Sequence, residues 1–540
     1  MKGWHPEMLT TTSKRRSAAA ILAGALLLAP LAACGSSGSD DKATGSPSAA
    51  ADPASFDRTA TITIGTPSPS NILDPALQNN IGQNTFTFLI YDSLTQMDSD
   101  YQVQPMLATS WEYAADGSSL TLKLRDDVTF NDGTKFDASV VEANINRGKT
   151  LQGSALVAAL NPIDKVVVED DYTVRLELKK GLGAELPAVF ALNAGMMVSP
   201  KAFTERGGEL ATDPGTAGSG PYIPVQVTSG QELVLERSDD YWNDDTAYAQ
   251  KLIVRTVVDQ AARINGVQTG DLDVAQISGA SPVQESLALV DRGAFEGDLI
   301  SQATPVVLML NAERGDLKKP EIRQAIAMAV NREEMVEGLF AGNATAADQF
   351  YAEGFWAHDD DFGAERPFDA DAAKKLVEEA GGAEIDVAAA TGSTAEPVAQ
   401  ALQDQLGKVG IKVNLQSIPF AQIDDMYRRG ELDAQVINAS PAPDPASTMD
   451  YYVTSGFNAA RGHGDLFGSL VAEAADPTKS IDERAAKYHE IWKIMAEKDV
   501  WVPILWGQQV WVRNDKVANV PNLSWVRSGF PSYRDIGKVK

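Results

Sequence analysis

The sequence after Ser301 alternates amphipathic helices with short apolar strands, and this alternation restricts the fold class most. Residues 305–311 form a continuous apolar run, which is typical of a strand covered on both faces. From Glu321 to Val330, apolar residues recur at the spacing of one helix face. Two further pairs follow, each a helix pattern before a strand pattern: 371–380 before 385–387, and 398–409 before 411–415. The alternation predicts an α/β fold.

The first 300 residues carry shorter strand patterns separated by turns. Residues 61–65 and 174–179 alternate apolar and polar side chains, as a half-buried strand does. Asp116-Gly117 predicts a tight turn between strands at 111–113 and 120–124. Asp137 is placed to cap a following helix. Later in the chain, Asn331 with Glu334 predicts a capping box.

The one cysteine of the 540-residue chain, Cys34, follows a segment typical of an export signal. The basic triplet 14–16 precedes an apolar run at 18–29, and small residues lie directly before Cys34. This arrangement resembles a bacterial lipobox, whose thiol is acylated before the leader is removed. We therefore expect a signal peptide at 1–33, lipidation of Cys34 and a flexible tether at 34–58. The apolar run is shorter than the about 20 residues that span a bilayer.

Several classes of function are disfavoured by composition. Without a second cysteine, the chain has no disulfide framework, cysteine-based zinc site or cysteine nucleophile beyond Cys34. A formal net charge of -28 repels nucleic acid and anionic headgroups. The phosphate-loop, HExxH and GxSxG motifs are missing from the sequence. His358, His463 and His489 are isolated in sequence, so we expect neither metal nor cofactor.

Four segments in the same order carry a resemblance to a known family. They are Pro105–Val141, which includes S-W-E-Y and F-N-D-G-T-K-F-D-A, then G-S-G-P-Y at 218–222, R-Q-A-I-A-M-A-V at 323–330, and V-G-I-K-V at 409–413. Together they resemble the family 5 solute-binding proteins, the peptide-type receptors of bacterial ABC importers. The resemblance covers about 60–540. Val140 stands where the family usually has an acidic residue, and Asp137 can cap that helix instead.

The resemblance implies a two-lobed, periplasmic-binding-protein-like α/β fold of type II, in its large peptide-binding class. Lobe one would comprise 59–303 plus 501–540, with an inserted subdomain at about 105–200, and lobe two would comprise 304–500. The lobes would close on a solute by a hinge. The protein would be a monomeric receptor, not an enzyme, held on the extracytoplasmic face by its lipid and working with ABC permease subunits.

Candidate ligand-binding residues follow from the loops that end lobe-two strands. In peptide-binding members, an aspartate after the strand at 434–438 pairs with the ligand's ammonium group, and Asp444 matches it. A carboxylate buried by closure needs such a cation. The alternative is that Asp444 only stabilises a proline turn. The other candidates are Asn438, Ser440 and Asn311 as hydrogen-bonding residues, Trp506 as a stacking residue, and, with less support, Asn84 and Trp356.

The tryptophans at 501, 506 and 511 are spaced in fives, and core packing is the ordinary role of such residues. The solute stays open at this stage: an oligopeptide or dipeptide is the default, and an oligosaccharide, an opine or a metal chelate is the alternative. A secreted hydrolase working with two carboxylates is a second hypothesis. With 74 acidic residues, some carboxylate pair always exists, so composition gives that hypothesis little support.

Overall fold

A computed structural model describes residues 51–67, 72–78, 84–98, 101–362, 367–454, 462–463, 466–520 and 533–540. These residues belong to one compact unit, Gly45–Lys540. The predicted signal peptide, Cys34 and most of the predicted tether lie outside the described residues. The end of the predicted tether is folded, because Phe56 is buried and stacks on the ring of Tyr248 at 4.6 Å. Within the described residues, no helix has the length and apolarity needed to cross a membrane.

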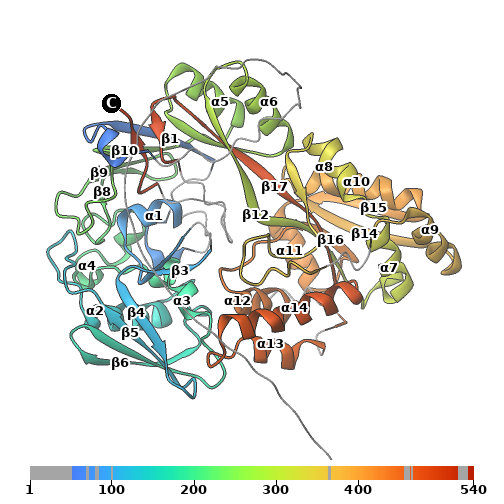
Figure 1. Ribbon diagram of the computed structural model, residues 1–540, viewed down its shortest axis with the longest axis horizontal. Helices are drawn as coiled ribbons and strands as arrows, with labels where there is room; N and C mark the ends of the chain where they lie inside the picture. Colours follow the sequence, from blue (N-terminus) through green and yellow to red (C-terminus); the bar gives the residue numbers. More distant parts are fainter. Residues whose placement is uncertain are drawn as a thin grey trace, which may run out of the picture. The chain divides into compact units, whose positions relative to one another are not determined.

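An 11-stranded sheet runs through the described residues, and two long antiparallel strands cross its centre (Figure 1). The central strands are β12 (Glu296–Leu310) and β17 (Trp501–Arg513). On one side of them, in sheet order outward from β12, lie β16 (Ala434–Asn438), β14 (Ala383–Ala390) and β15 (Ile411–Ile418), which run parallel to one another. On the other side, outward from β17, lie β11 (Val274–Ser278), β1 (Thr61–Thr66), β10 (Lys251–Thr256), β9 (Glu232–Arg237) and β8 (Tyr222–Thr228). A short strand, β13 (Ala344–Ala346), also pairs with β17.

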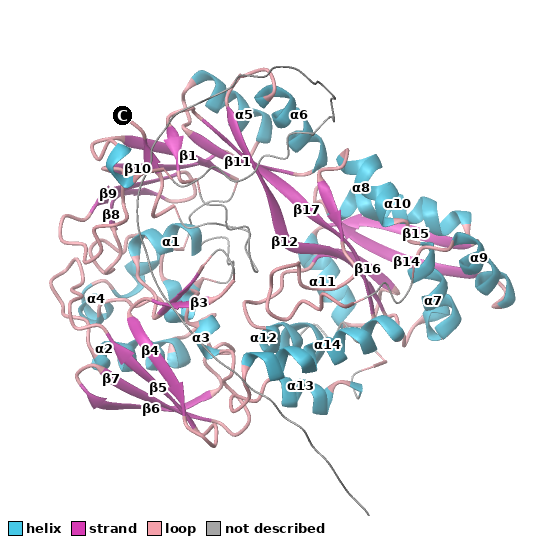
Figure 2. Cartoon of the chain, viewed as in Figure 1, coloured by secondary structure: helices cyan, strands magenta, loops and turns pink. Residues whose placement is uncertain are grey.

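A separate four-stranded sheet is built from the segment predicted as the inserted subdomain (Figure 2). Its order is β4 (Ala108–Tyr113), β5 (Ser119–Leu124), β7 (Thr173–Leu178) and β6 (Ile163–Asp170), all antiparallel. The small pairs β2 (Thr95–Met97) with β3 (Val103–Pro105), and β18 (Val517–Ala518) with β19 (Gly537–Lys538), complete the strands.

Helices cover both faces of the large sheet. The helices are α1 (Asn84–Ile90), α2 (Ala138–Thr150), α3 (Leu186–Val189), α4 (Pro200–Glu205), α5 (Gln260–Thr269), α6 (Ala280–Val290), α7 (Pro320–Ala329), α8 (Arg332–Phe340), α9 (Ala370–Glu379), α10 (Ala395–Lys408), α11 (Phe420–Arg428), α12 (Pro445–Met449), α13 (Gly468–Ala474) and α14 (Ile481–Glu497). In β12, Val306 and Leu308 pack in the core that includes α7, α8 and α10, whereas Val307 packs in the core that includes α11 and α14. This explains why the apolar run at 305–311 is continuous rather than alternating.

The local sequence signals are confirmed with two adjustments. Asp137 caps α2 through the backbone N–H groups of Ser139 and Val140, and the turn at Gly117 has a positive φ of 69°. The predicted capping box at Asn331 is only half formed: Asn331 accepts from the N–H of Glu334, but its own N–H donates to Gln405. Strand β12 begins well before the predicted 305–311, because residues 296–301 also pair with β17.

The described residues form five hydrophobic cores. Two cores centre on residues 306–505, one on residues 76–197, and two on strands β1, β9–β11 and the last part of β17. Trp501, Val502, Ile504 and Leu505 pack in the cores of the 306–500 region, although the predicted lobe two ends at residue 500, and the division into lobe one and lobe two remains a prediction.

A buried carboxylate ties the C-terminal segment to the first part of the chain. Asp92 is fully buried, and its Oδ1 lies 2.7 Å from Nη1 of Arg534. The hydroxyl of Tyr241 donates to the same oxygen, and Oδ2 accepts from Trp242 Nε1 at 2.9 Å and from Ser219 Oγ at 3.1 Å. Ser219 belongs to the G-S-G-P-Y motif, whose Gly218 lies so close to the backbone of Ile90 that a Cβ would overlap it. The motif is therefore part of the scaffold.

Candidate ligand-binding site

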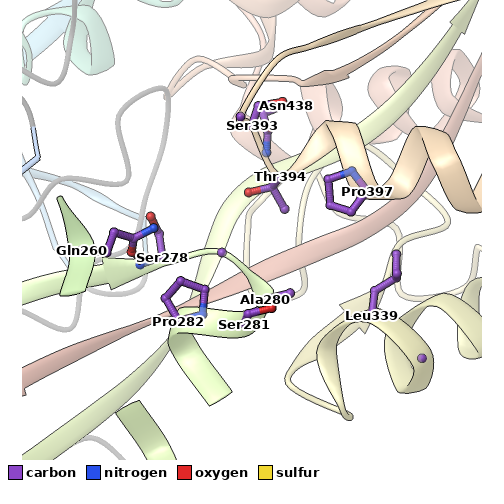
Figure 3. Close-up of a pocket in the computed structure, with 13 residues that line it drawn as sticks. Gln260, Ser278, Ala280, Ser281, Pro282, Leu339, Ser393, Thr394, Pro397 and Asn438 are labelled. Carbon is purple, nitrogen blue, oxygen red and sulfur yellow. Dashed lines mark hydrogen bonds between the residues drawn. The ribbon is translucent and has the colours of Figure 1, made fainter. Parts of the chain in front are cut away.

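A cavity of about 670 Å³ lies where strand ends from the two sides of the large sheet approach each other (Figure 3). Asn438 ends β16 and pairs with Val306 of β12, while Ser278 ends β11 and pairs with Gln509 of β17. Because β14 and β16 are parallel, the loop after β14 reaches the same edge as Asn438. Open α/β sheets commonly bind ligands at the carboxyl ends of their strands. The topology thus places this cavity where a ligand site is expected.

The cavity walls offer neutral hydrogen-bonding groups. One wall comes from α5, β11 and the start of α6, and the other comes from the end of α8, the loop before α10, and β16. Among the described lining residues, none carries a formal charge; the polar ones are Gln260, Ser278, Ser281, Ser393, Thr394 and Asn438. Gln260 is positioned by accepting from the N–H of Ser278 at 3.0 Å. Figure 3 shows Gln260 and Asn438 on opposite walls.

Helices α6 and α10 both begin at this cavity. Their N-cap residues, Gly279 and Thr394, make no side-chain cap hydrogen bond. The loop before α10 is held instead by Glu396, whose Oε2 accepts from the N–H of Gly392 at 2.7 Å. That hydrogen bond, with another from Ser417, lowers the pKa of Glu396. The N-terminal turns of both helices therefore line the cavity, although Pro282 and Pro397 bring no N–H group to it.

Three predicted ligand residues lie at or near the centre of the sheet. Asn438 lines the cavity. Ser440, two residues further, is half-buried outside the cavity lining, and its N–H donates to the hydroxyl of Tyr452 at 2.8 Å. Trp506 lies on β17 beside Pro305 and is 5% exposed. Its indole Nε1 is buried and has no hydrogen-bond partner among the described residues, as is also true of Trp501 and Trp511, so this observation does not distinguish a ligand-stacking role from core packing.

Asn311 and Asn84 are not brought to Asn438. Asn311 follows the opposite end of β12, because Leu310 pairs with Ala434 at the start of β16. It is 1% exposed, and its amide donates to Leu432 O and accepts from the N–H of Glu313. These bonds fit a strand-end turn. Asn84 is the first residue of α1, and its side chain lies outside the description.

Asp444 lies in a buried ion pair. Its Oδ1 is 2.7 Å from Nη2 of Arg484, and the two side chains are 6% and 8% exposed. The same oxygen accepts from the N–H of Ala446 and caps α12. Trp356, also predicted as a ligand residue, lies in this cluster, with its ring 5.1 Å from the guanidinium carbon of Arg484. Burial, the largest single cause, lowers the pKa of Arg484, but Asp444 and Tyr488 together outweigh it and the pKa is raised.

The structure thus gives Asp444 a cation from within the chain. A ligand ammonium at Asp444 would have to share this carboxylate with Arg484. The role of Asp444 as a ligand contact stays a prediction.

Most of the cavity lining was not predicted from the sequence. Gln260, Ser278 and the polar loop 392–394 carry no motif that distinguishes them from other strand-end loops. Their signal is positional: each lies at or near the carboxyl end of a buried strand, as Asn438 does. By contrast, Trp501 and Trp511 are confirmed as core residues, with 4% and 0% of their surface exposed.

Comparison with known proteins identifies relatives over most of the chain. Residues 102–460 match the family described as bacterial extracellular solute-binding proteins, family 5, middle region. The chain is 30% identical, over 375 residues, to the glutathione-binding protein GsiB of Pectobacterium atrosepticum, a match that covers 67% of this chain and 70% of the relative.

Solved structures share the fold. NikA from Brucella suis, in complex with Fe(III)-EDTA, superposes with a TM-score of 0.78 at 24% identity and covers 87% of this chain and 98% of its own. DppA from Helicobacter pylori, in complex with the peptide STSA, has a TM-score of 0.72 at 21% identity and covers 90% of this chain and 99% of its own. These structures correspond to the expected two-lobed α/β class.

Proposed function

Because this chain belongs to the bacterial extracellular solute-binding proteins of family 5, we propose that it captures an oligopeptide or dipeptide outside the cell membrane and delivers it to an ABC importer. The observation that carries this proposal is the cavity at the ends of β11, β14 and β16, whose two walls supply neutral donors and acceptors. Peptide groups present the complementary amide donors and acceptors. Closure of the walls around the solute would supply the form that the permease recognises.

A non-peptide solute is the second candidate. The uncharged polar lining would also suit a hydroxyl-rich or chelate ligand, and the solved relative NikA is in complex with Fe(III)-EDTA. We assign the protein no catalytic step, and we propose that it acts as a monomer.

Binding can be tested on the purified protein by native mass spectrometry and then by thermal unfolding with di- to pentapeptides and with oligosaccharides. We expect peptides at about 100 times their Kd to add about 2.7 kcal/mol of stability, a rise of a few degrees in Tm. Saturation without turnover would support a receptor. A rise with oligosaccharides alone would keep the receptor and reject the peptide, whereas hydrolysis of an added solute would favour the hydrolase hypothesis.

Asn438→Ala should weaken binding of the peptide found in that screen. Loss of one neutral hydrogen bond, at about 0.5–1.5 kcal/mol, corresponds to an affinity roughly two- to tenfold lower by titration calorimetry. Asn146→Ala is the matched control, because Asn146 is exposed on α2, away from the cavity. Equal affinities of the two variants would reject Asn438 as a ligand contact.

We also propose that Cys34 carries the lipid anchor. Replacing Cys34 with serine removes the thiol that would be acylated, so we expect cells to lose the fatty-acid label on the protein and to release it from the membrane fraction. The measurement is metabolic labelling with a radioactive fatty acid, followed by fractionation. Continued labelling of the Cys34→Ser variant would contradict the proposal.

A further inference from the structure

The β4–β7 sheet touches the helices α12–α14 although the two are far apart in sequence. The turn between β4 and β5 reaches the loop between α13 and α14: a Cβ added to Gly117 would lie 3.0 Å from Thr478 Cγ2 and 3.1 Å from Pro477 Cγ. A second contact joins Tyr101, which lies shortly before β3, to Phe355, which lies between α8 and α9: their ring centroids are 5.8 Å apart. Opening of the predicted lobes would separate these contacts.

A cluster of titratable groups lies at this contact. Glu185 is half-buried directly before α3, in a loop that Tyr113 holds by donating its hydroxyl to Gly183 O at 2.6 Å. From the other side, Asp444 and Arg484 are both within electrostatic range of Glu185. Tyr113 and Tyr488 are the other titratable groups that sense Glu185 among the described residues.

The charge of Arg484 is already balanced without Glu185. Its Nη2 lies 2.7 Å from Asp444, and its Nε donates to Ala474 O at 2.7 Å. An ionised Glu185 would therefore bring a second carboxylate to a pair that is already neutral. A protonated Glu185 would add no charge.

We propose that Glu185 makes closure of the β4–β7 sheet onto α12–α14 depend on pH, with the closed contact favoured when Glu185 is protonated. This rests on the proposed receptor function, in which closure retains the solute. It predicts a receptor that holds its solute more tightly in acidic surroundings and releases it more readily as the pH rises.

The direction follows from linkage. Burial first, and then Asp444, raise the pKa of Glu185 from its ordinary 4.5 to about 7, against the opposing effects of a backbone hydrogen bond at Glu185 itself, of Arg484 and of a backbone hydrogen bond at Gly183. In an open form, water reaches the carboxyl group and the pKa returns toward 4.5. Because the closed form has the higher pKa, its advantage is complete below 4.5 and is lost as the pH rises through about 7. Between these limits, the ratio of closed to open protein should fall by up to about tenfold per pH unit.

The test is small-angle X-ray scattering of the solute-free protein from pH 4.5 to pH 8. We expect the radius of gyration to increase with pH in the unaltered protein, and Glu185→Gln to keep the compact value throughout. Glu112→Gln is the matched control, because Glu112 is an exposed glutamate beside Tyr113, and it should behave as the unaltered protein does. Glu185→Ala repeats the test should the glutamine variant unfold.

A second measurement detects closure directly at the contact. Cysteines introduced at Gly117 and Thr478, in the background of Cys34→Ser, should form a disulfide only when the two loops meet; the strain of a cysteine at the positive φ of Gly117 is the same with and without Glu185→Gln. At each pH, the rate of disulfide formation is measured in the cysteine pair with Glu185→Gln and in the pair that retains Glu185. Dividing the first rate by the second removes the pH dependence of the thiols themselves. We expect this ratio to increase as the pH rises from 5 to 8. A constant ratio, together with a radius that does not change with pH, would overturn the proposal. Since no solute is used, this result is independent of which solute the protein binds.

Discussion

Asp92→Asn should lower the free energy of unfolding by about 3–5 kcal/mol, because it removes the fully buried carboxylate that forms an ion pair with the guanidinium of Arg534, whose side chain is 11% exposed. The substitution keeps the size of the side chain, so the loss measures charge and hydrogen bonding rather than packing. One carboxylate currently accepts from Arg534, Tyr241, Trp242 and Ser219. An amide in its place presents one oxygen and one NH₂ group, and the latter would face these donors.

The measurement for Asp92 is urea unfolding followed by tryptophan fluorescence. Asp213→Asn is the control: Asp213 also pairs with an arginine, at 3.2 Å, but its side chain is 61% exposed. Exposed pairs contribute about 0–1 kcal/mol, so this variant should unfold close to the unaltered protein. Equal unfolding midpoints for the two variants would show that the network around Asp92 does not stabilise the fold.

Asp444→Asn should cost a similar amount, about 3–5 kcal/mol, because Arg484 would keep a buried charge and lose the carboxylate that is hydrogen-bonded to it. Asparagine can still cap α12, so loss of the cap is excluded as the cause. In the double variant Asp444→Asn with Arg484→Met, the unpaired charge is gone, and we expect most of the lost stability to return. Urea unfolding of the two variants checks this.

The same double variant tests whether Asp444 also binds the solute. Should Asp444 hold a ligand ammonium group, the double variant would be stable but would bind peptides at least about tenfold more weakly, as loss of a charged hydrogen bond does. Should Asp444 act only in folding, both stability and peptide affinity would return. The two roles are thereby separated, which the single Asp444→Ala variant cannot do because it changes stability and affinity together.

The sequence predicted secondary structure well where local chemistry decides it. Asp137 caps α2 because its carboxylate reaches the next two N–H groups, which needs no partner from elsewhere. The prediction was incomplete where a distant partner competes, as at Asn331, whose N–H is taken by Gln405, 74 residues away. The same holds for the length of β12, since residues 296–304 are less apolar and become strand by pairing with β17.

The candidate site divides in the same way. Asn438 was identified because it ends a buried strand, and the structure places it in the cavity. The opposite wall, from Gln260 to Pro282, was missed, since nothing in the sequence shows that the end of β11 faces the end of β16 across β12 and β17. Trp356 and Asp444 were both predicted as ligand residues. In the structure both contact Arg484, which lies over the ring of Trp356 and forms an ion pair with Asp444.

Local patterns in the sequence were enough to predict the α/β class and the order of the elements, and to identify the resemblance to solute-binding proteins whose family the match over residues 102–460 establishes. Those properties depend on hydrophobic periodicity and on short motifs, which involve residues close together in the sequence. The fold was needed to identify which buried carboxylates are paired with arginines of the same chain, as Asp92 is with Arg534 and Asp444 with Arg484. The physical reason is that burial and charge pairing join residues separated by 442 and 40 positions, and no local pattern specifies such a distance.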